Sequence, residues 1–341
     1  MKKILKITPP PITGYPDYAY PLSIVLNEPD NQAWLFCNFI QLYYTSEDTD
    51  NSINYYYTDI NNRMWDARNP LLDYQTIHKD TLKNFNIDII EFFIKMIDMG
   101  YYCYTYFDEY YMSCSPAYKQ VHFPHVSFIY GYDLENKKFY IAGYDKTYKY
   151  NYNEIDFDML KEAYDLCERD YYDDKNTIYL MIYSHKSTKY KFDINVVLEQ
   201  LNEYLFSVNT SKRYNLCFNP RPNLTFGINA VEELIKKIDK MIEEQNINLS
   251  YKPFYILLEH KKLMNLRIDY LIEQGYLNTE CLSKKMFIEL ESKYSLIQNL
   301  AVKYSITRTT DLLRKAKNLI ANSIQLEKES IAKLIDEIDK R

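Results

Sequence analysis

The sequence predicts an α+β fold, in which helices pack on an antiparallel sheet and a helical region follows. Two observations favour this class. The chain alternates short helical and strand-like patterns up to about residue 206, and from about residue 228 its period is helical almost without interruption. Hydrophobic residues make up 47% of the 341 residues, enough to build a sizeable core in one large domain or two ordinary ones.

The change of pattern divides the chain into three regions. We expect a mixed domain over residues 1–206, a linker over 207–227 and a helical domain over 228–341. The linker contains Asn219-Pro-Arg-Pro-Asn223, where two prolines prevent regular structure.

Helices open the first region and recur within it. One is predicted from Asp17 or Tyr20 to Asn27, another over 31–44, and residues 45–59 form a polar loop. A helix over 88–99 is marked by one wide apolar face, with Gly100 following as its C′ residue.

A β-hairpin is the clearest local pattern. The aromatic and β-branched runs 126–132 and 139–144 flank the polar turn 133–138. The remaining patterns predict strands over 101–107, 177–183 and 189–192 and helices over 193–206, 230–244, 254–274, 283–304 and 310–340.

Composition excludes several classes of function. Only 6 glycines occur, and no GxGxxG or GxxxxGK loop is present, so the usual nucleotide cradles are excluded. The net charge of −6 and the absence of a basic stripe exclude nucleic acid as a partner. No stretch approaches the ~20 apolar residues of a membrane span or forms a signal sequence, which predicts a cytoplasmic protein with no membrane partner.

The 6 cysteines lack any CxxC or metal-ligand spacing, so reduced thiols are expected. The histidines at 78, 185 and 260 lie in polar surroundings with no second histidine at i+4, which excludes an HExxH zinc helix.

The other two histidines, in His122-Phe-Pro-His125, stand at the mouth of the hairpin. Cross-strand partners there have numbers summing to 270–272, which places Asp145 opposite His125 or one residue off. Such a pair suits nucleophilic catalysis: Asp145 would fix the imidazole tautomer and His125 would deprotonate a thiol. The alternative is a structural histidine at a strand end beside a surface aspartate.

Two adjacent acids, Asp108 and Glu109, end the strand before these histidines. On an extended strand they face opposite sides, so they do not form a carboxylate pair for glycoside chemistry. We expect Asp108 and Tyr110 to bind substrate, with one of the two acids holding a substrate amine. The alternative is a pair of acids that are solvated or bonded to tyrosine.

Much of the chain, from about Tyr15 to the carboxyl terminus, resembles a known family. The residues that carry the resemblance lie at 100–111, 115–118, 122–125, 129–133, 139–145, 225–228, 258–264 and 267–271. Through them the chain is similar to the papain-like proteins encoded with bacterial nonribosomal peptide and related antibiotic clusters. These include the amino-terminal domain of the butirosin biosynthesis acyltransferase and the amide-forming cysteine-peptidase-like proteins of polythioamide pathways.

This resemblance implies a papain-like domain with a Cys-His-Asp site and with no metal and no organic cofactor. Such a site takes an acyl group from the phosphopantetheinyl thioester of a carrier protein and gives it to an amine acceptor. His125 and Asp145 match the family motif, but the cysteine that opens the first helix corresponds here to Asp17-Tyr-Ala19. Cys37 is the nearest cysteine; it is either the nucleophile or a core residue with a raised pKa. The alternative function is a catalytically inactive scaffold that binds a peptide or a carrier protein.

Overall fold

The computed structural model describes residues 1–47, 52–56, 69–168, 174–184, 190–214, 223–244 and 250–340. The chain forms two compact units, each built from two segments. Unit 1 comprises Met1–Pro29 and Met64–Thr188, and unit 2 comprises Asp30–Arg63 and Lys189–Arg341. Helix accounts for 53% of the described residues and strand for 19%, so the predicted mixture of helices, antiparallel sheet and a helical carboxyl-terminal region is confirmed.

This division differs from the boundaries expected from the sequence. Residues 30–63 and 189–206, which the pattern assigned to the amino-terminal domain, belong to unit 2. The reason is long-range pairing, because Tyr43 and Tyr44 form a ladder with Phe226 and Thr225. Part of the expected linker, 215–222, lies outside the described residues.

Unit 1 is built on a seven-stranded antiparallel sheet with the order β4-β9-β5-β6-β7-β8, and β1 pairs with the end of β6. The strands are β1 (Lys2–Ile4), β4 (Leu72–His78), β5 (Tyr102–Asp108), β6 (Pro124–Asp133), β7 (Lys138–Tyr144), β8 (Tyr150–Asp156) and β9 (Thr177–Tyr183). The helices are α1 (Pro16–Val25), α3 (Lys79–Asn84), α4 (Ile89–Asp98) and α5 (Phe157–Asp165), with 3-10 turns η3 (Glu109–Tyr111) and η4 (Asp174–Asn176).

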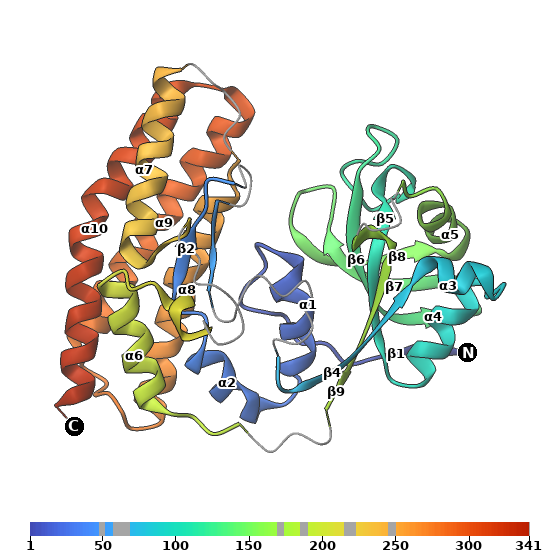
Figure 1. Cartoon of the computed structure of the whole chain (residues 1–341), viewed down its shortest axis with the longest axis horizontal. Coiled ribbons are helices and arrows are strands. Elements are labelled where there is room, and N and C mark those ends of the chain that lie inside the picture. The colour runs from blue at the N-terminus through green and yellow to red at the C-terminus, as the bar shows by residue number, and fades with distance from the viewer. Residues whose placement is uncertain are drawn as a thin grey trace. The chain divides into compact units, whose positions relative to one another are not determined.

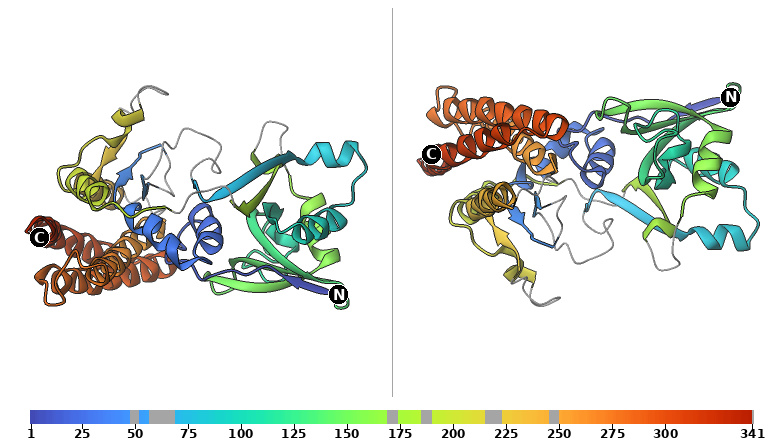
Figure 2. Two further views of the ribbon diagram at one scale, coloured as in Figure 1. Left: turned by 90° about the horizontal axis from the view of Figure 1, so that it is seen from below. Right: turned by 90° about the horizontal axis from the view of Figure 1, so that it is seen from above.

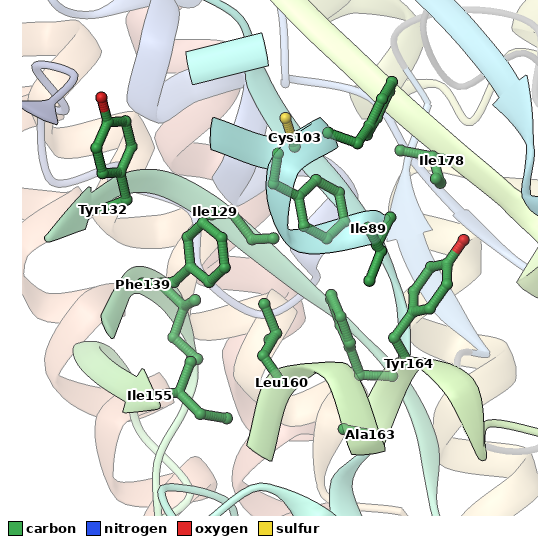
Figure 3. Close-up of a cluster of buried hydrophobic side chains, with 14 of the residues drawn as sticks. Ile89, Cys103, Ile129, Tyr132, Phe139, Ile155, Leu160, Ala163, Tyr164 and Ile178 are labelled. Atoms are coloured by element: carbon green, nitrogen blue, oxygen red, sulfur yellow. The ribbon is translucent and has the colours of Figure 1, made fainter. Parts of the chain in front are cut away.

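Helices cover both faces of this sheet (Figure 1). On one face α4 and α5 bury an apolar cluster; Figure 3 shows Leu160 of α5 pointing towards Ile129 and Phe139 of the hairpin. On the other face Tyr20 of α1 stacks on Phe128, with 4.9 Å between ring centroids. The alternation of side chains along β6 therefore separates the two layers.

Local patterns predicted α4 and the hairpin correctly. Asp88 caps α4 by accepting hydrogen bonds from the N–H groups of Ile90 and Glu91, and Gly100 has a φ of 89° just beyond the helix. In the hairpin Phe128 faces Ala142, and a bulge after Ile129 shifts the register by one residue. The sums of paired numbers therefore agree with the predicted register.

Unit 2 combines six helices with a small antiparallel sheet among the described residues. The helices are α2 (Gln32–Cys37), α6 (Ile194–Leu205), α7 (Gly227–Glu243), α8 (Lys252–Glu273), α9 (Leu282–Thr307) and α10 (Thr310–Asp339). The sheet has the order β10 (Thr225–Phe226), β2 (Leu42–Tyr44) and β3 (Ile53–Tyr55). Both views of Figure 2 show α9 and α10, in orange and red, lying side by side. The four predicted carboxyl-terminal helices are confirmed.

Three local predictions were wrong. The helix expected over 31–44 ends at Cys37, because Phe39 adopts a left-handed φ of 56° and the chain continues into β2. The loop expected over 45–59 contains β3. Residues 190–192 form no strand, and residue 189 lies outside the described residues. None of the helices in the described ranges is long and apolar enough to cross a membrane.

Candidate functional site

Two acids and two histidines meet in unit 1 where β5 ends and β6 begins. We call Asp108, Glu109, His122 and His125 the carboxylate–histidine cluster. The ladder pairs Asp108 with Pro124 and Phe107 with His125, so the end of β5 lies beside the His122-Phe-Pro-His125 segment. Sheet register therefore brings both acids next to both histidines.

Glu109 holds His125. The Nδ1 atom of His125 lies 2.8 Å from Oε1 of Glu109, whose side chain is only 8% exposed. The Oγ of Ser115 donates a hydrogen bond to Oε2 of Glu109, so both carboxylate oxygens are engaged. Because the carboxylate accepts the Nδ1 proton, the Nε2 atom of His125 carries the lone pair.

The surroundings of His125 leave its ring accessible. The side chain is 24% exposed, and its ring centroid lies 5.3 Å from that of Phe123 and 5.9 Å from that of Tyr144. Within the described part of the chain, Nε2 has no hydrogen-bond partner. An oriented imidazole with an open Nε2 can accept a proton from a bound nucleophile.

Asp108 holds His122 and the backbone around it. Its Oδ2 lies 2.6 Å from Nδ1 of His122, and its Oδ1 accepts the N–H groups of Tyr110 and Phe123, each at 3.0 Å. The His122 side chain is 63% exposed and stacks on Tyr110, with 4.3 Å between ring centroids. Asp108 is therefore a positioning residue with three protein donors, and substrate binding by Asp108 stays a prediction. Tyr110 contacts His122, and substrate binding by Tyr110 stays a prediction.

Asp145 is not the partner of His125, contrary to the sequence prediction. Its carboxylate accepts hydrogen bonds from Asn151 Nδ2 at 2.9 Å and from the N–H and Oγ of Thr147 at 2.7 and 2.6 Å. These bonds, Asn151 first, lower the pKa of Asp145 to about 2. Asp145 therefore organises the turn between β7 and β8, and Glu109 takes the orienting role.

Sequence reasoning missed Glu109 because it applied strand alternation across the end of a strand. β5 ends at Asp108 and η3 begins at Glu109, so the two side chains no longer alternate across a sheet. The pairing of β5 with β6, which places both acids beside the strand that carries His125, could have identified Glu109 as the partner of His125.

Cys37 lies in the interior of unit 2 and does not have the environment of a nucleophile. Its side chain is fully buried at the carboxyl end of α2, and its Sγ accepts the N–H of Asp193 at 3.4 Å. Burial raises the pKa of the thiol and outweighs the opposing effects, which include the positive charge of Arg267. The helix dipole disfavours a thiolate at this end as well. We therefore assign Cys37 to the core.

Cys103 and Cys114 of unit 1 are also held as thiols. Burial raises the pKa of Cys103 strongly and that of Cys114 to about 11. The negative charges of Glu109 and Asp145 raise the Cys114 value further, and Lys146 opposes them. The amino end of α1 reads Pro16-Asp-Tyr18, without a cysteine.

No group of three or more His, Cys, Asp or Glu side chains is arranged to hold a metal ion among the residues that the structure describes. The imidazole of His125, oriented by Glu109, makes the cluster a candidate acid–base site. Neither a protein-family model nor a curated protein matches the sequence.

Proposed function

We propose that unit 1 is a papain-like domain that catalyses amide-forming acyl transfer from a carrier-protein thioester to an amine in the assembly of a secondary-metabolite peptide. The observation that carries the proposal is the pairing of His125 with the buried carboxylate of Glu109, which leaves Nε2 open. The resemblance described above supplies the reaction class, and the pair supplies a general base of the kind that this class needs.

The reaction proceeds without a covalent enzyme intermediate. The amine nitrogen attacks the thioester carbonyl carbon while Nε2 of His125 accepts a proton from the amine. The new C–N bond forms and the C–S bond breaks. The imidazolium, stabilised by Glu109, then gives its proton to the departing thiolate of the phosphopantetheinyl arm. The products are an amide and a free carrier thiol.

Direct attack agrees with the chemistry of the cysteines. Burial raises the pKa of both Cys37 and Cys114, so neither is a ready thiolate at neutral pH. In the family that the chain resembles, a cysteine opens the first helix, and Asp17 stands at that place here. The base therefore acts on the acceptor amine rather than on a thiol.

Mass spectrometry of reactions with an acyl-loaded carrier protein and an amine tests this proposal. We expect an amide product with the unmodified protein and a loss of about 10²-fold or more in rate with His125→Gln. Cys37→Ala should keep the rate, and no cysteine should become acylated. The matched control is His78→Gln, because His78 also lies on this sheet and its Nε2 contacts Asn176 at 2.9 Å. An acylated cysteine, or an unchanged rate with His125→Gln, contradicts the mechanism.

The second candidate is a catalytically silent scaffold that binds a peptide or a carrier protein. The observation that favours it is the absence of a cysteine from the start of α1, where Asp17 follows Pro16. A scaffold would bind the carrier protein but form no amide, and His125→Gln would then leave binding unchanged.

A further inference from the structure

Two lysines of unit 1 converge on one aromatic ring near the carboxylate–histidine cluster. The Nζ atoms of Lys119 and Lys146 each lie 5.6 Å from the centroid of the Tyr118 ring. The two ammonium groups are therefore no further apart than twice that distance. Among the described residues, neither lysine forms an ion pair with a carboxylate. We call Tyr118, Lys119 and Lys146 the basic ledge.

The fold holds both lysines in place. Lys119 has a left-handed φ of 55°, and its N–H donates to the carbonyl of Tyr110 at 3.0 Å. A lysine in this region is strained, so the surrounding loop must fix it. Lys146 follows Asp145, whose carboxylate organises the turn through Thr147 and Asn151. Asp145 therefore fixes the turn from which Lys146 extends.

The two segments that carry the basic ledge are positively charged, unlike the whole protein. Residues 110–123 and 146–149 contain three lysines and no aspartate or glutamate, although the chain has a net charge of −6. The only carboxylate of the β7–β8 turn, Asp145, is occupied by hydrogen-bond donors. Ammonium groups that are not paired with a carboxylate attract an anion.

The basic ledge lies near the carboxylate–histidine cluster. Lys146 is two residues beyond Tyr144, whose ring lies 5.9 Å from that of His125. The N–H of Lys119 donates to the carbonyl of Tyr110, whose ring stacks on His122. A ligand that spans a short distance can therefore reach the ledge and His125 together.

We infer that the basic ledge binds the phosphate of the acyl donor while the thioester of the same molecule reaches His125. The inference rests on the proposed function, since it names the anchor for that donor. Lysine ammonium groups bind phosphate as point charges, and charge-assisted hydrogen bonds are the strong ones. The ligand class is a phosphorylated pantetheine thioester, carried by a protein or by coenzyme A.

Titration calorimetry with 4′-phosphopantetheine and pantetheine tests the inference, because these probes differ only in the phosphate. We expect the unmodified protein to bind 4′-phosphopantetheine at least tenfold more tightly, and the variant Lys119→Ala with Lys146→Ala to lose that preference. The matched control is Lys83→Ala with Lys137→Ala, which removes two exposed lysines of unit 1 and should retain the preference. Equal binding of the two probes, or full preference in the Lys119 and Lys146 variant, overturns the inference.

Competition identifies the source of the phosphate. Displacement of 4′-phosphopantetheine by a phosphopantetheinylated carrier protein, but not by its unmodified form, assigns the ledge to the carrier arm. Displacement by coenzyme A alone assigns it to a free thioester. Binding requires no turnover, so a protein that binds the phosphate but forms no amide disproves the proposed reaction and keeps the ledge.

Discussion

Each unit contains a buried glutamate that accepts hydrogen bonds from several donors. The two sites differ in whether a donor residue reaches solvent. In unit 1, Glu109 holds His125, which reaches solvent. In unit 2, Glu327 is 1% exposed; it pairs with Lys261 and accepts the hydroxyls of Tyr204 and Tyr294 at 2.6 and 2.9 Å. Both carboxylates have their hydrogen-bond partners, but only Glu109 orients a residue that still has an atom without a hydrogen bond to any described residue, the Nε2 of His125.

The two histidines show the same difference. Both nitrogens of His260 are used in unit 2: Nε2 donates to the carbonyl of Ile40 at 2.8 Å, and Nδ1 accepts from Lys261 at 3.0 Å. Burial, followed by the charge of Lys261, lowers the pKa of His260 well below its ordinary value. His125 uses one nitrogen only. A buried polar network with every partner satisfied specifies packing, whereas an oriented group with a free atom is available for chemistry.

Removal of one partner from the Lys261–Glu327 pair should give the largest change in stability. Lys261→Met leaves the carboxylate of Glu327 buried without its cation, which costs about 3–5 kcal/mol. Urea denaturation followed by circular dichroism measures this loss. The same substitution should not alter the binding of 4′-phosphopantetheine, because the pair belongs to unit 2.

A double variant separates the charge from the packing. Lys261→Met with Glu327→Gln removes both charges and keeps a carbonyl oxygen for the hydroxyls of Tyr204 and Tyr294. It should recover most of the stability that the single variant loses. A single variant that unfolds at the same urea concentration as the unmodified protein would show that the pair contributes nothing.

Glu109→Gln should affect activity far more than stability. The glutamine keeps the size of the side chain and an acceptor for Ser115, but it removes the charge that stabilises the imidazolium of His125. We expect amide formation to fall about 10²-fold. Glu154→Gln, at an exposed glutamate that pairs with Lys138, is the control. Equal rates for Glu109→Gln and the unmodified protein would remove Glu109 from the mechanism.

The elements with a clear local period could be predicted from the sequence, and the contacts between distant residues could not. The apolar face of α4 and the register of the hairpin follow from periods of 3.6 and 2. Lys261 and Glu327, by contrast, are 66 residues apart on different helices. Charged residues on a helix are usually solvated, so nothing local marks these two as buried partners.

The partner of His125 was mispredicted for a related reason. The register correctly brought the Asp145 end of β7 near His125, since Tyr144 contacts the His125 ring. Register fixes backbone neighbours, but hydrogen bonds depend on which donors a turn offers. Asn151 and Thr147 donate hydrogen bonds to the carboxylate of Asp145, and His125 pairs with Glu109 instead.

The smallest expected effect concerns the pH dependence that Asp145 contributes. Its pKa is lowered to about 2 from an ordinary 3.8, first by the Asn151 amide and then by Thr147. An unfolded chain therefore binds the proton more readily than the folded one. The stabilisation by Asp145 is complete above about pH 4, decreases as the pH falls towards 2, and is absent below that value.

Asp145→Asn should therefore lower the urea midpoint of unfolding slightly at pH 6. The difference from the unmodified protein should disappear between pH 4 and 2, because the native carboxylate also loses its charge there. The effect is small because the side chain lies at the surface, where solvent screens the interaction. Glu135→Gln, at an exposed residue of the β6–β7 turn, controls for the loss of one negative charge. A midpoint difference that stays constant down to pH 2 would mean that the carboxylate of Asp145 does not stabilise its turn through its charge.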